Sequence, residues 1–176
     1  MRTLEDLERL WRAMPPAPRD RGRVQAICVR KGNGVHETPS RVTLSEQSGV
    51  EGDRWADGAD RDPEAQVTLM AARVADLVAS ERTPFFSAGD NFYVDFDLAE
   101  DALPPGTRLR VGTAVLEVSS KPHTGCKKFR ERFGIDALRW VNHRTNRALR
   151  LRGINCRVVA PGEVSVGDDV TVLPAF

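Results

Sequence analysis

The stretch that decides the fold class is PPGTRLRVGTAVLEVS, residues 104–119. Two runs in which apolar and polar residues alternate, 107–111 and 113–119, flank a glycine at position 112. Alternation of this kind is typical of half-buried strands, and a glycine between two such runs favours a hairpin. The stretch therefore predicts two antiparallel strands that lead directly into the segment beginning at Lys121.

Short strands of the same kind are predicted on both sides of this hairpin. They are expected over 23–30, 41–45, 66–70, 92–96 and 154–159, with a hairpin-like pair over 162–173. Helices are expected over 71–79, from Cys126 to Gly134, and over 137–143 with Asp136 as its cap. Many short strands separated by Gly and Pro turns, with few helices between them, favour a mainly β (α+β) barrel or sandwich over a doubly wound sheet.

The start of the chain predicts an amphipathic helix over residues 3–14. Its apolar face is formed by Leu4, Leu7, Leu10, Trp11 and Met14. Three prolines at positions 15, 16 and 18 then end the helix and stiffen the connector. We expect residues 1–20 to form an N-terminal helix and Pro-rich connector, packed on the domain or on a second subunit, and residues 21–176 to form one barrel domain.

Composition is ordinary for a soluble globular protein, with 176 residues of which 40% are hydrophobic and 29% charged. The three cysteines, Cys28, Cys126 and Cys156, are odd in number and widely spaced, which argues against a disulfide framework. The charged start Met1–Asp6 has no apolar signal core, and no run approaches the length of a membrane span. These features predict a cytoplasmic protein.

One cysteine has an unusual setting, in the sequence KPHTGCKKFRERF at residues 121–133. Cys126 follows a Pro-His-Thr-Gly loop and precedes a short helix, and four basic residues follow it within six positions. A helix N-terminus and nearby cations both favour the thiolate, which attacks electrophiles and ligates soft metals. The alternative is that Cys126 is a small buried apolar residue, as free cysteines often are.

Charge is distributed unevenly along the chain. Residues 121–152 hold ten Lys or Arg and two acids, a net charge of +8, while sixteen basic and twenty-three acidic residues leave the remainder at −7. A basic block in an otherwise acidic chain indicates an anionic partner, although such blocks are often only solvated helix faces. Its coincidence with Cys126 favours a functional interpretation.

Several turns, taken in order, match a known pattern. They are Gly52-Asp53-Arg54, Val67-Thr68-Leu69, Gly89-Asp90-Asn91, Pro122 to Cys126, and Val166-Gly167-Asp168-Asp169-Val170. This order resembles the MOSC domain, named for the C-terminal part of molybdenum-cofactor sulfurases. The resemblance spans residues 23–173 and is to small stand-alone bacterial-type members. The chain has no room for the pyridoxal-phosphate desulfurase domain to which some MOSC domains are fused.

The resemblance implies a MOSC-type β-barrel with a few peripheral helices, and a function at Cys126. Related proteins bind the molybdenum–pterin cofactor and reduce N-hydroxylated compounds, so Cys126 would be the molybdenum ligand and catalytic residue of an oxidoreductase acting on such small molecules. A phosphate-bearing pterin also suits Lys, Arg and backbone donors. The expected cofactor-binding residues are Gly52, Asp53, Arg54, Asn91, His123, Lys127, Lys128, Arg144 and Arg147. Two positions depart from the family pattern: Trp55 replaces a usual His, and Asp90 replaces a usual Glu.

Other functions remain open at this point. Cys126 could instead carry a persulfide for sulfuration of a cofactor or metal cluster, with a cysteine desulfurase as partner in place of a redox partner. A non-enzymatic barrel binding anions or RNA would use the same arginines, with Trp140, Phe129 and Phe133 as the aromatic candidates, although helical spacing favours a core position for both phenylalanines. We expect no nucleic-acid or membrane partner. A zinc site from His123, Cys126, His143 and Cys156 is a weaker alternative, and His36 is expected in a surface loop.

Overall fold

The structure is a computed structural model, and it describes residues 1–59 and 61–175. The α-helices are α1 (Leu4–Ala13), α2 (Ala72–Val78), α3 (Lys127–Phe133) and α4 (Ile135–Asn142), and the 3₁₀ helices are η1 (Pro63–Ala65), η2 (Phe85–Ala88) and η3 (Arg144–Leu149). The strands are β1 (Arg21–Ile27), β2 (Val29–Gly32), β3 (Val35–Glu37), β4 (Arg41–Ser45), β5 (Gly49–Val50), β6 (Val67–Ala71), β7 (Phe92–Asp95), β8 (Arg108–Val111), β9 (Ala114–Val118), β10 (Ile154–Ala160), β11 (Gly162–Ser165) and β12 (Asp169–Val172).

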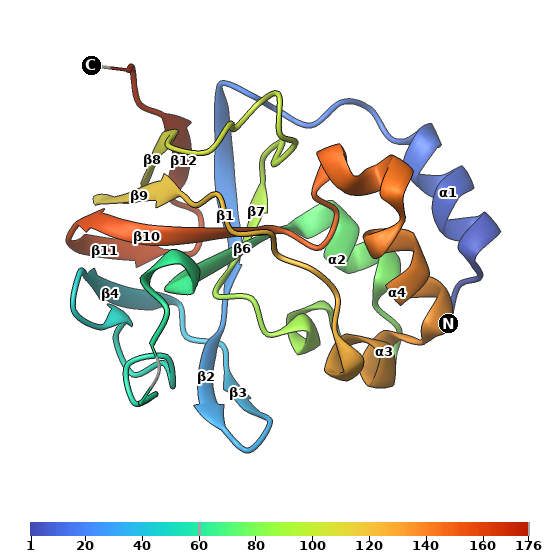
Figure 1. The fold of residues 1–176 in the computed structure, drawn as a ribbon, viewed down its shortest axis with the longest axis horizontal. Helices are drawn as coiled ribbons and strands as arrows, with labels where there is room; N and C mark the ends of the chain where they lie inside the picture. Colours follow the sequence, from blue (N-terminus) through green and yellow to red (C-terminus); the bar gives the residue numbers. More distant parts are fainter. Residues whose placement is uncertain (60, 176) are drawn as a thin grey trace.

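Seven strands close into a barrel in the order β1-β12-β8-β9-β10-β6-β7, and β7 returns to β1 (Figure 1). All neighbours are antiparallel except β6 and β7, which run parallel. The barrel interior follows from the alternation seen in the sequence. In β9, Ala114, Leu116 and Val118 are buried while Val115 and Glu117 are partly exposed. The structure thus confirms a mainly β chain built on a barrel.

Two predicted strands differ from the structure in instructive ways. The single strand expected over 23–30 divides at Cys28: β1 stays in the barrel, and β2 pairs with β3 in a separate two-stranded sheet. The prediction that residues 162–173 form a hairpin-like pair is wrong, because β11 pairs with β4 whereas β12 pairs with β1 and β8. Adjacent alternating segments can join different sheets, and local pattern does not distinguish these partners.

The α-helices gather on one side of the barrel (Figure 1). The expected N-terminal helix is confirmed as α1, with Thr3 accepting the backbone N–H of Asp6 at 3.2 Å. The helix expected over 137–143 begins earlier, at Ile135, and its N-cap is Gly134 instead of Asp136. In α2 the apolar face packs beside β6, a strand whose five residues are all buried.

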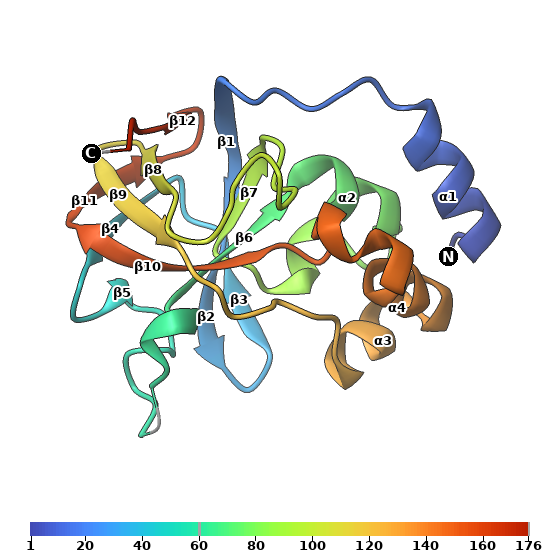
Figure 2. The ribbon, with the colours of Figure 1, turned by 45° about the horizontal axis from the view of Figure 1, so that its top comes forward.

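The N-terminal helix packs on the domain itself, against α4 and η3. Trp11 and Trp140 meet edge-on, with ring centroids 6.0 Å apart. The Asn146 side-chain amide of η3 donates to Glu8 of α1 at 3.1 Å and to the Trp140 carbonyl at 3.0 Å. Figure 2 shows α1 beside α4, joined to β1 by the extended connector. The first helix thereby braces elements more than a hundred residues away in sequence.

The β2–β3 hairpin projects from the body of the molecule (Figure 1). Its tip turns through Gly32, Asn33 and Gly34, which all have positive φ. Two glycines in this run lower the strain of such a turn. Its base is fastened by Arg30, whose carbonyl accepts the Arg54 N–H at 2.7 Å. A hairpin held in this way can form the wall of a cavity.

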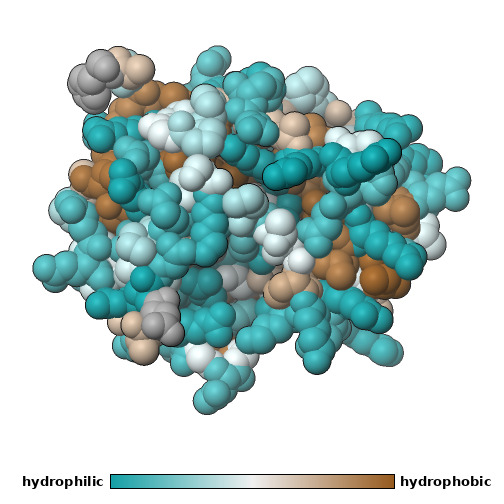
Figure 3. Space-filling model, in the orientation of Figure 1, coloured by the Kyte–Doolittle hydropathy of each residue, from teal (hydrophilic) through white to brown (hydrophobic). Residues whose placement is uncertain are grey.

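The face of the molecule seen in Figure 3 is largely hydrophilic, with smaller apolar patches between charged side chains. Within residues 1–59 and 61–175, no helix has the length and apolar character that crossing a bilayer requires.

Candidate functional site

The segment Lys121–Cys126 leaves the barrel after β9 and crosses to the helical side at α3 (Figure 2). Two asparagines hold it in place. Asn155 of β10 donates to the carbonyls of Lys121 and Pro122 at 3.1 and 3.3 Å. Asn142 at the end of α4 accepts the Gly125 N–H at 2.8 Å and donates to the Gly125 carbonyl at 2.9 Å. The positions of His123 and Cys126 are therefore fixed by both the barrel and the helices.

Cys126 is exposed and stands at the N-cap of α3, where its side chain makes no capping hydrogen bond. Cys126 lines a cavity of about 180 Å³, here called the Cys126 cavity. The cavity is bounded by the β2–β3 hairpin, the turn before β7, the Lys121–Cys126 segment and α3. It is lined by Arg30, Gly32, Gly34, Val35, His36, Arg54, Ala88, Gly89, His123, Thr124, Cys126, Lys128, Phe129, Arg132 and Arg152.

The charge of the Cys126 cavity is one-sided. Five of its described lining residues are Lys or Arg, and none is Asp or Glu. Two of the arginines are neutralised from behind, Arg30 by Asp53 and Arg152 by Asp90. Arg132 donates to the Ser87 carbonyl at 2.7 Å. An anionic ligand beside Cys126 would meet the remaining positive charge at close range.

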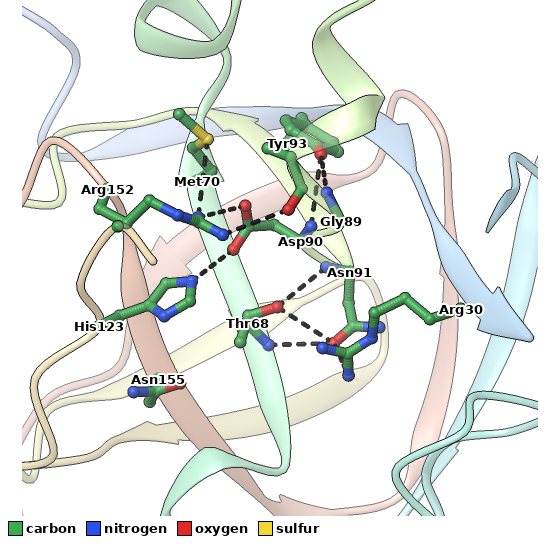
Figure 4. Close-up of polar contacts among 12 residues, drawn as sticks. Arg30, Thr68, Met70, Gly89, Asp90, Asn91, Tyr93, His123, Arg152 and Asn155 are labelled. Atoms are coloured by element: carbon green, nitrogen blue, oxygen red, sulfur yellow. Dashed lines mark hydrogen bonds and ion pairs between the residues drawn. The ribbon is translucent and has the colours of Figure 1, made fainter. Parts of the chain in front are cut away.

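A buried charged cluster forms the floor of this cavity (Figure 4). Asp90 is completely buried, and one of its carboxylate oxygens accepts from Arg152 Nη1 at 2.5 Å. The other oxygen lies 2.7 Å from His123 Nε2. Arg152 also donates to the Ala88 carbonyl at 3.2 Å, and its guanidinium lies 5.1 Å from the Phe129 ring centroid. The cluster joins β10, the turn before β7 and the Lys121–Cys126 segment.

The pKa values of the cluster follow from these contacts. Burial by itself would raise the pKa of Asp90, but the charges and hydrogen bonds of Arg152 and His123 outweigh it and hold that pKa well below its ordinary value. Burial lowers the pKa of His123, and the Arg152 charge lowers it further, against the opposing effect of Asp90. At neutral pH the cluster is thus an ionised carboxylate between a guanidinium and a neutral imidazole.

A second network lies directly behind the cavity wall. Arg30 binds Asp53 through its Nε and Nη2, at 3.0 and 2.8 Å. The Asn91 amide donates to Asp53 at 3.0 Å, and its oxygen accepts the Thr68 N–H at 3.1 Å. Asp53 and Asn91 are buried and are not among the lining residues, whereas Arg30 and Arg54 are. Of these three predicted residues, Arg54 lines the cavity, whereas Asp53 and Asn91 lie behind its wall.

A second, larger cavity of about 640 Å³ lies on the other side of the Lys121–Cys126 segment. We call it the arginine cleft, because Arg144, Arg147 and Arg150 of the η3 region line it together with Lys121. Arg144 and Arg147 are exposed and have no ion-pair partner among the described residues. Glu100 is the acid among the lining residues that the structure describes. This volume lies within the range of small-molecule sites.

The two cavities meet at three residues, His123, Thr124 and Arg152, which line both. Arg152 is 6% exposed, and its Nε has no hydrogen-bond partner within residues 1–59 and 61–175. A buried unpaired donor costs about 1–3 kcal/mol unless something satisfies it. A polar group bound at the junction would be suited to that donor.

The other predicted residues are placed as follows. Lys128 lines the Cys126 cavity, while Lys127 is 88% exposed and lies 3.8 Å from Glu131 of the same helix. Gly52 has φ +77 and its carbonyl accepts from Lys31, away from the described lining. Trp55 is turned toward its own loop, donating to the Asp62 carbonyl at 3.1 Å.

Sequence reasoning missed His36, which was expected in a surface loop. It lies instead on β3 and lines the Cys126 cavity, packed so closely on Gly89 that a Cβ there would be 3.2 Å from the imidazole. Burial lowers its pKa, as do Arg132, Arg30 and Arg54. The sequence pattern around His36 did not indicate a cavity position, because that position also depends on Gly89 and Arg132, which are distant in sequence.

The sequence profile of the MOSC domain matches residues 57–171, about two thirds of the chain. The chain belongs to the MOSC domain family. The match covers the barrel from before β6 through most of β12, including the Lys121–Cys126 segment.

Solved structures share this MOSC fold. YuaD from Bacillus subtilis is 18% identical, with a TM-score of 0.59 over 89% of this chain and 97% of that one. YiiM from Escherichia coli is 21% identical, with a TM-score of 0.58 over 88% and 71% of the two chains. YiiM from Geobacillus stearothermophilus is 19% identical, with a TM-score of 0.58 over 87% and 75%. No curated protein matches the sequence.

The remaining cysteines of this MOSC domain are in apolar surroundings. Cys28 and Cys156 are fully buried, and burial raises the pKa of Cys28 to about 12 and that of Cys156 still further above its ordinary value. With Cys156 inside the barrel, the zinc set named from the sequence does not assemble, and the described residues contain no cluster of three His, Cys, Asp or Glu able to hold a metal. Phe129, Phe133 and Trp140 are buried too, which confirms the core position of the phenylalanines and leaves those rings unavailable for stacking on RNA.

Proposed function

We propose that this MOSC domain binds the molybdenum–pterin cofactor through Cys126 and acts as an oxidoreductase on N-hydroxylated or similar small molecules. The observation that carries the proposal is the placement of one exposed thiol in a cavity whose charged lining residues are all cations. Molybdenum takes soft thiolate ligands, and a phosphate group takes arginine and lysine. The described residues therefore offer the donor types that the cofactor needs.

The fit extends to the arginine cleft. Cys126 would hold the metal, Lys128 and Arg54 would face the same ligand, and Arg144 and Arg147 would contact its phosphate. The unpaired Nε of Arg152, at the junction of the two cavities, is a further donor for a ligand that extends between them. When bound, the cofactor supplies the redox chemistry, and the protein supplies binding, orientation and charge.

The test is the molybdenum content of protein produced in a host that makes the cofactor. We expect about one metal per chain in the wild type and at least about tenfold less in Cys126→Ser, since even second-shell changes cost 10–100-fold in metal affinity. Cys28→Ala is the matched control, because its thiol is buried outside both cavities and its removal should leave the metal content unchanged. A folded wild type without molybdenum would refute the proposal.

A second candidate is a persulfide carrier, which the exposure of Cys126 favours because a partner protein can reach the sulfur. A cysteine desulfurase would be the partner in that case, and an electron-transfer protein in the first. Incubation with a desulfurase should add the mass of one sulfur to the wild type and not to Cys126→Ser. Equal uptake by both proteins would exclude this candidate.

A further inference from the structure

We propose that His123 is the proton relay of the Cys126 cavity: its Nδ1 takes up a proton from water in the arginine cleft and passes it to the hydroxyl oxygen that leaves when an N-hydroxylated compound is reduced. This inference rests on the proposed oxidoreductase function and adds a catalytic residue to it. It is argued from the position of the imidazole between two cavities and from its hydrogen bond to a buried carboxylate.

The hydrogen bond to Asp90 fixes which ring nitrogen is available. Asp90 is fully buried and already holds Arg152 on its other oxygen, so it is an ionised acceptor. His123 Nε2, 2.7 Å away, must therefore carry the hydrogen, and Nδ1 is left with the lone pair. Nδ1 makes no hydrogen bond to any residue that the structure describes, and Figure 4 shows it turned away from Asp90.

The position of the ring allows it both to meet a ligand and to recover a proton. His123 is 18% exposed in its side chain and lines both the Cys126 cavity and the arginine cleft. A ligand beside Cys126 can contact the ring from one side. Water in the larger cleft can reach it from the other, which provides a route for the proton to be replaced. A buried carboxylate behind an imidazole stabilises the imidazolium that forms in such an exchange.

The other groups facing His123 do not offer a comparable proton relay. In the Cys126 cavity they are the cations Arg30, Arg54, Lys128, Arg132 and Arg152, with the thiol of Cys126. In the arginine cleft they are Lys121, Arg144, Arg147, Arg150 and Glu100. An imidazole is the side chain whose charge most readily changes near neutral pH, which suits it to take up and release a proton. His36 is the alternative imidazole, and it has no carboxylate partner among the described residues.

The step balances with an external source of electrons. His123, neutral at rest, first takes up a proton on Nδ1 from water. Two electrons then come from an electron-transfer protein, the N–O bond breaks, and the bond between Nδ1 and this proton breaks at the same time. That proton forms the second O–H bond of the departing water. The nitrogen takes its own proton from solvent, and His123 is neutral again. The sum is a hydroxylamine, two electrons and two protons giving an amine and water.

The chain has three histidines, so substituting each of them in turn tests every imidazole that could carry the proton. In cofactor-loaded protein we expect His123→Gln to keep its molybdenum while turnover of an N-hydroxylated substrate falls about 10²–10³-fold, the size of effect usual for general acid catalysis. His36→Gln should lose less than about tenfold. His143→Asn should match the wild type, because His143 lies outside the described lining of both cavities and asparagine can replace it as the cap of η3.

Two further measurements separate proton transfer from a structural role. Added imidazole should raise the activity of His123→Ala at least tenfold, because the deleted ring leaves a space open to both cavities. In metal-free protein, nitrogen NMR of the rings should show His123 neutral at pH 7 with its hydrogen on Nε2. A hydrogen on Nδ1 of His123 would overturn the inference. So would a loss of activity in a His36 variant that added imidazole restores, if His123→Ala shows no such rescue.

The outcomes also distinguish this inference from the function on which it rests. A wild type that binds molybdenum and reduces substrate, combined with a His123→Gln variant within about twofold of it, would overturn the role of His123 alone. Loss of metal and activity together in His123→Gln would make the residue a cofactor-holding group and would likewise overturn it. A wild type that binds no molybdenum would refute the function and this inference together.

Discussion

The Cys126 cavity and the arginine cleft share a wall but differ in the chemistry of their linings. The first holds a thiol and two imidazoles among cations, in about 180 Å³. The second is wider, about 640 Å³, and apart from the shared His123 its basic residues are Lys and Arg, which keep their charge at neutral pH. One region therefore has groups that can exchange protons and form bonds, and the other has groups suited to anchoring an anion. Three predictions test this division, from the largest expected effect to the smallest.

The largest effect is expected at the junction of the two regions. Asp90→Ala would leave Arg152 buried without its carboxylate, and breaking a buried ion pair in this way costs about 3–5 kcal/mol. Urea unfolding followed by circular dichroism would measure it. Glu131→Ala is the control, because it removes a carboxylate from an exposed ion pair with Lys127 and should change stability little. Equal losses of stability in the two variants would mean that the buried ion pair between Asp90 and Arg152 contributes no more to stability than an exposed one.

An intermediate effect is expected for anion binding in the cleft. Inorganic pyrophosphate is the probe, and Arg144→Ala and Arg147→Ala should each weaken it about fivefold, since an exposed charged contact contributes about 1 kcal/mol. Titration calorimetry at two salt concentrations would show the loss and its screening. Lys128→Ala, on the other side of the wall, should leave the affinity unchanged. A loss in Lys128→Ala alone would place the anion beside Cys126 and reverse the assignment.

The smallest effect is expected for the stability of the folded protein at acidic pH. The folded protein lowers the pKa of His123, so the stabilisation from keeping that ring neutral is complete above its ordinary value of about 6.5 and is lost as the pH falls toward the lower folded value. Asp90, whose pKa is also lowered, adds a second loss only below about pH 4.

The melting temperature should therefore decline as the pH falls below about 6.5, and that of His123→Gln should decline less. A difference of about 2–4 °C corresponds to 1 kcal/mol in a chain of this size, and scanning calorimetry would resolve it. Identical curves for the two proteins would show that the titrating group lies elsewhere, with His36 as the next candidate because its pKa is lowered too.

Sequence reasoning succeeded where neighbours in the chain are neighbours in space. The hairpin of β8 and β9 and the strand β4 were both predicted from local pattern. It could not establish which motif residues face a ligand. Asp53 and Asn91 were expected to line the pocket, yet they bond to Arg30 and Thr68 behind it, because the direction of a side chain in a turn depends on partners elsewhere.

Contacts across long sequence separations account for the other gaps. His36 reaches the Cys126 cavity only because the chain leaves the barrel at Cys28 and forms the β2–β3 hairpin. In the sequence, Arg152 is one of several arginines in a basic block. In the structure it binds Asp90, which lies sixty-two positions earlier. The contact between Arg152 and Asp90 has no local signal, since it joins residues that are distant in the sequence.

The bracing of η3 by α1 has a consequence for how the protein responds to shortening. Glu8 and Trp11 hold Asn146 and Trp140, so deleting the first dozen residues would strip support from the arginines without removing any group that meets a ligand. Such a truncated protein would keep the thiol of Cys126 and its cavity, while the arginine cleft would lose a packing partner, so a change at the far end of the polypeptide could alter one cavity and leave the other intact.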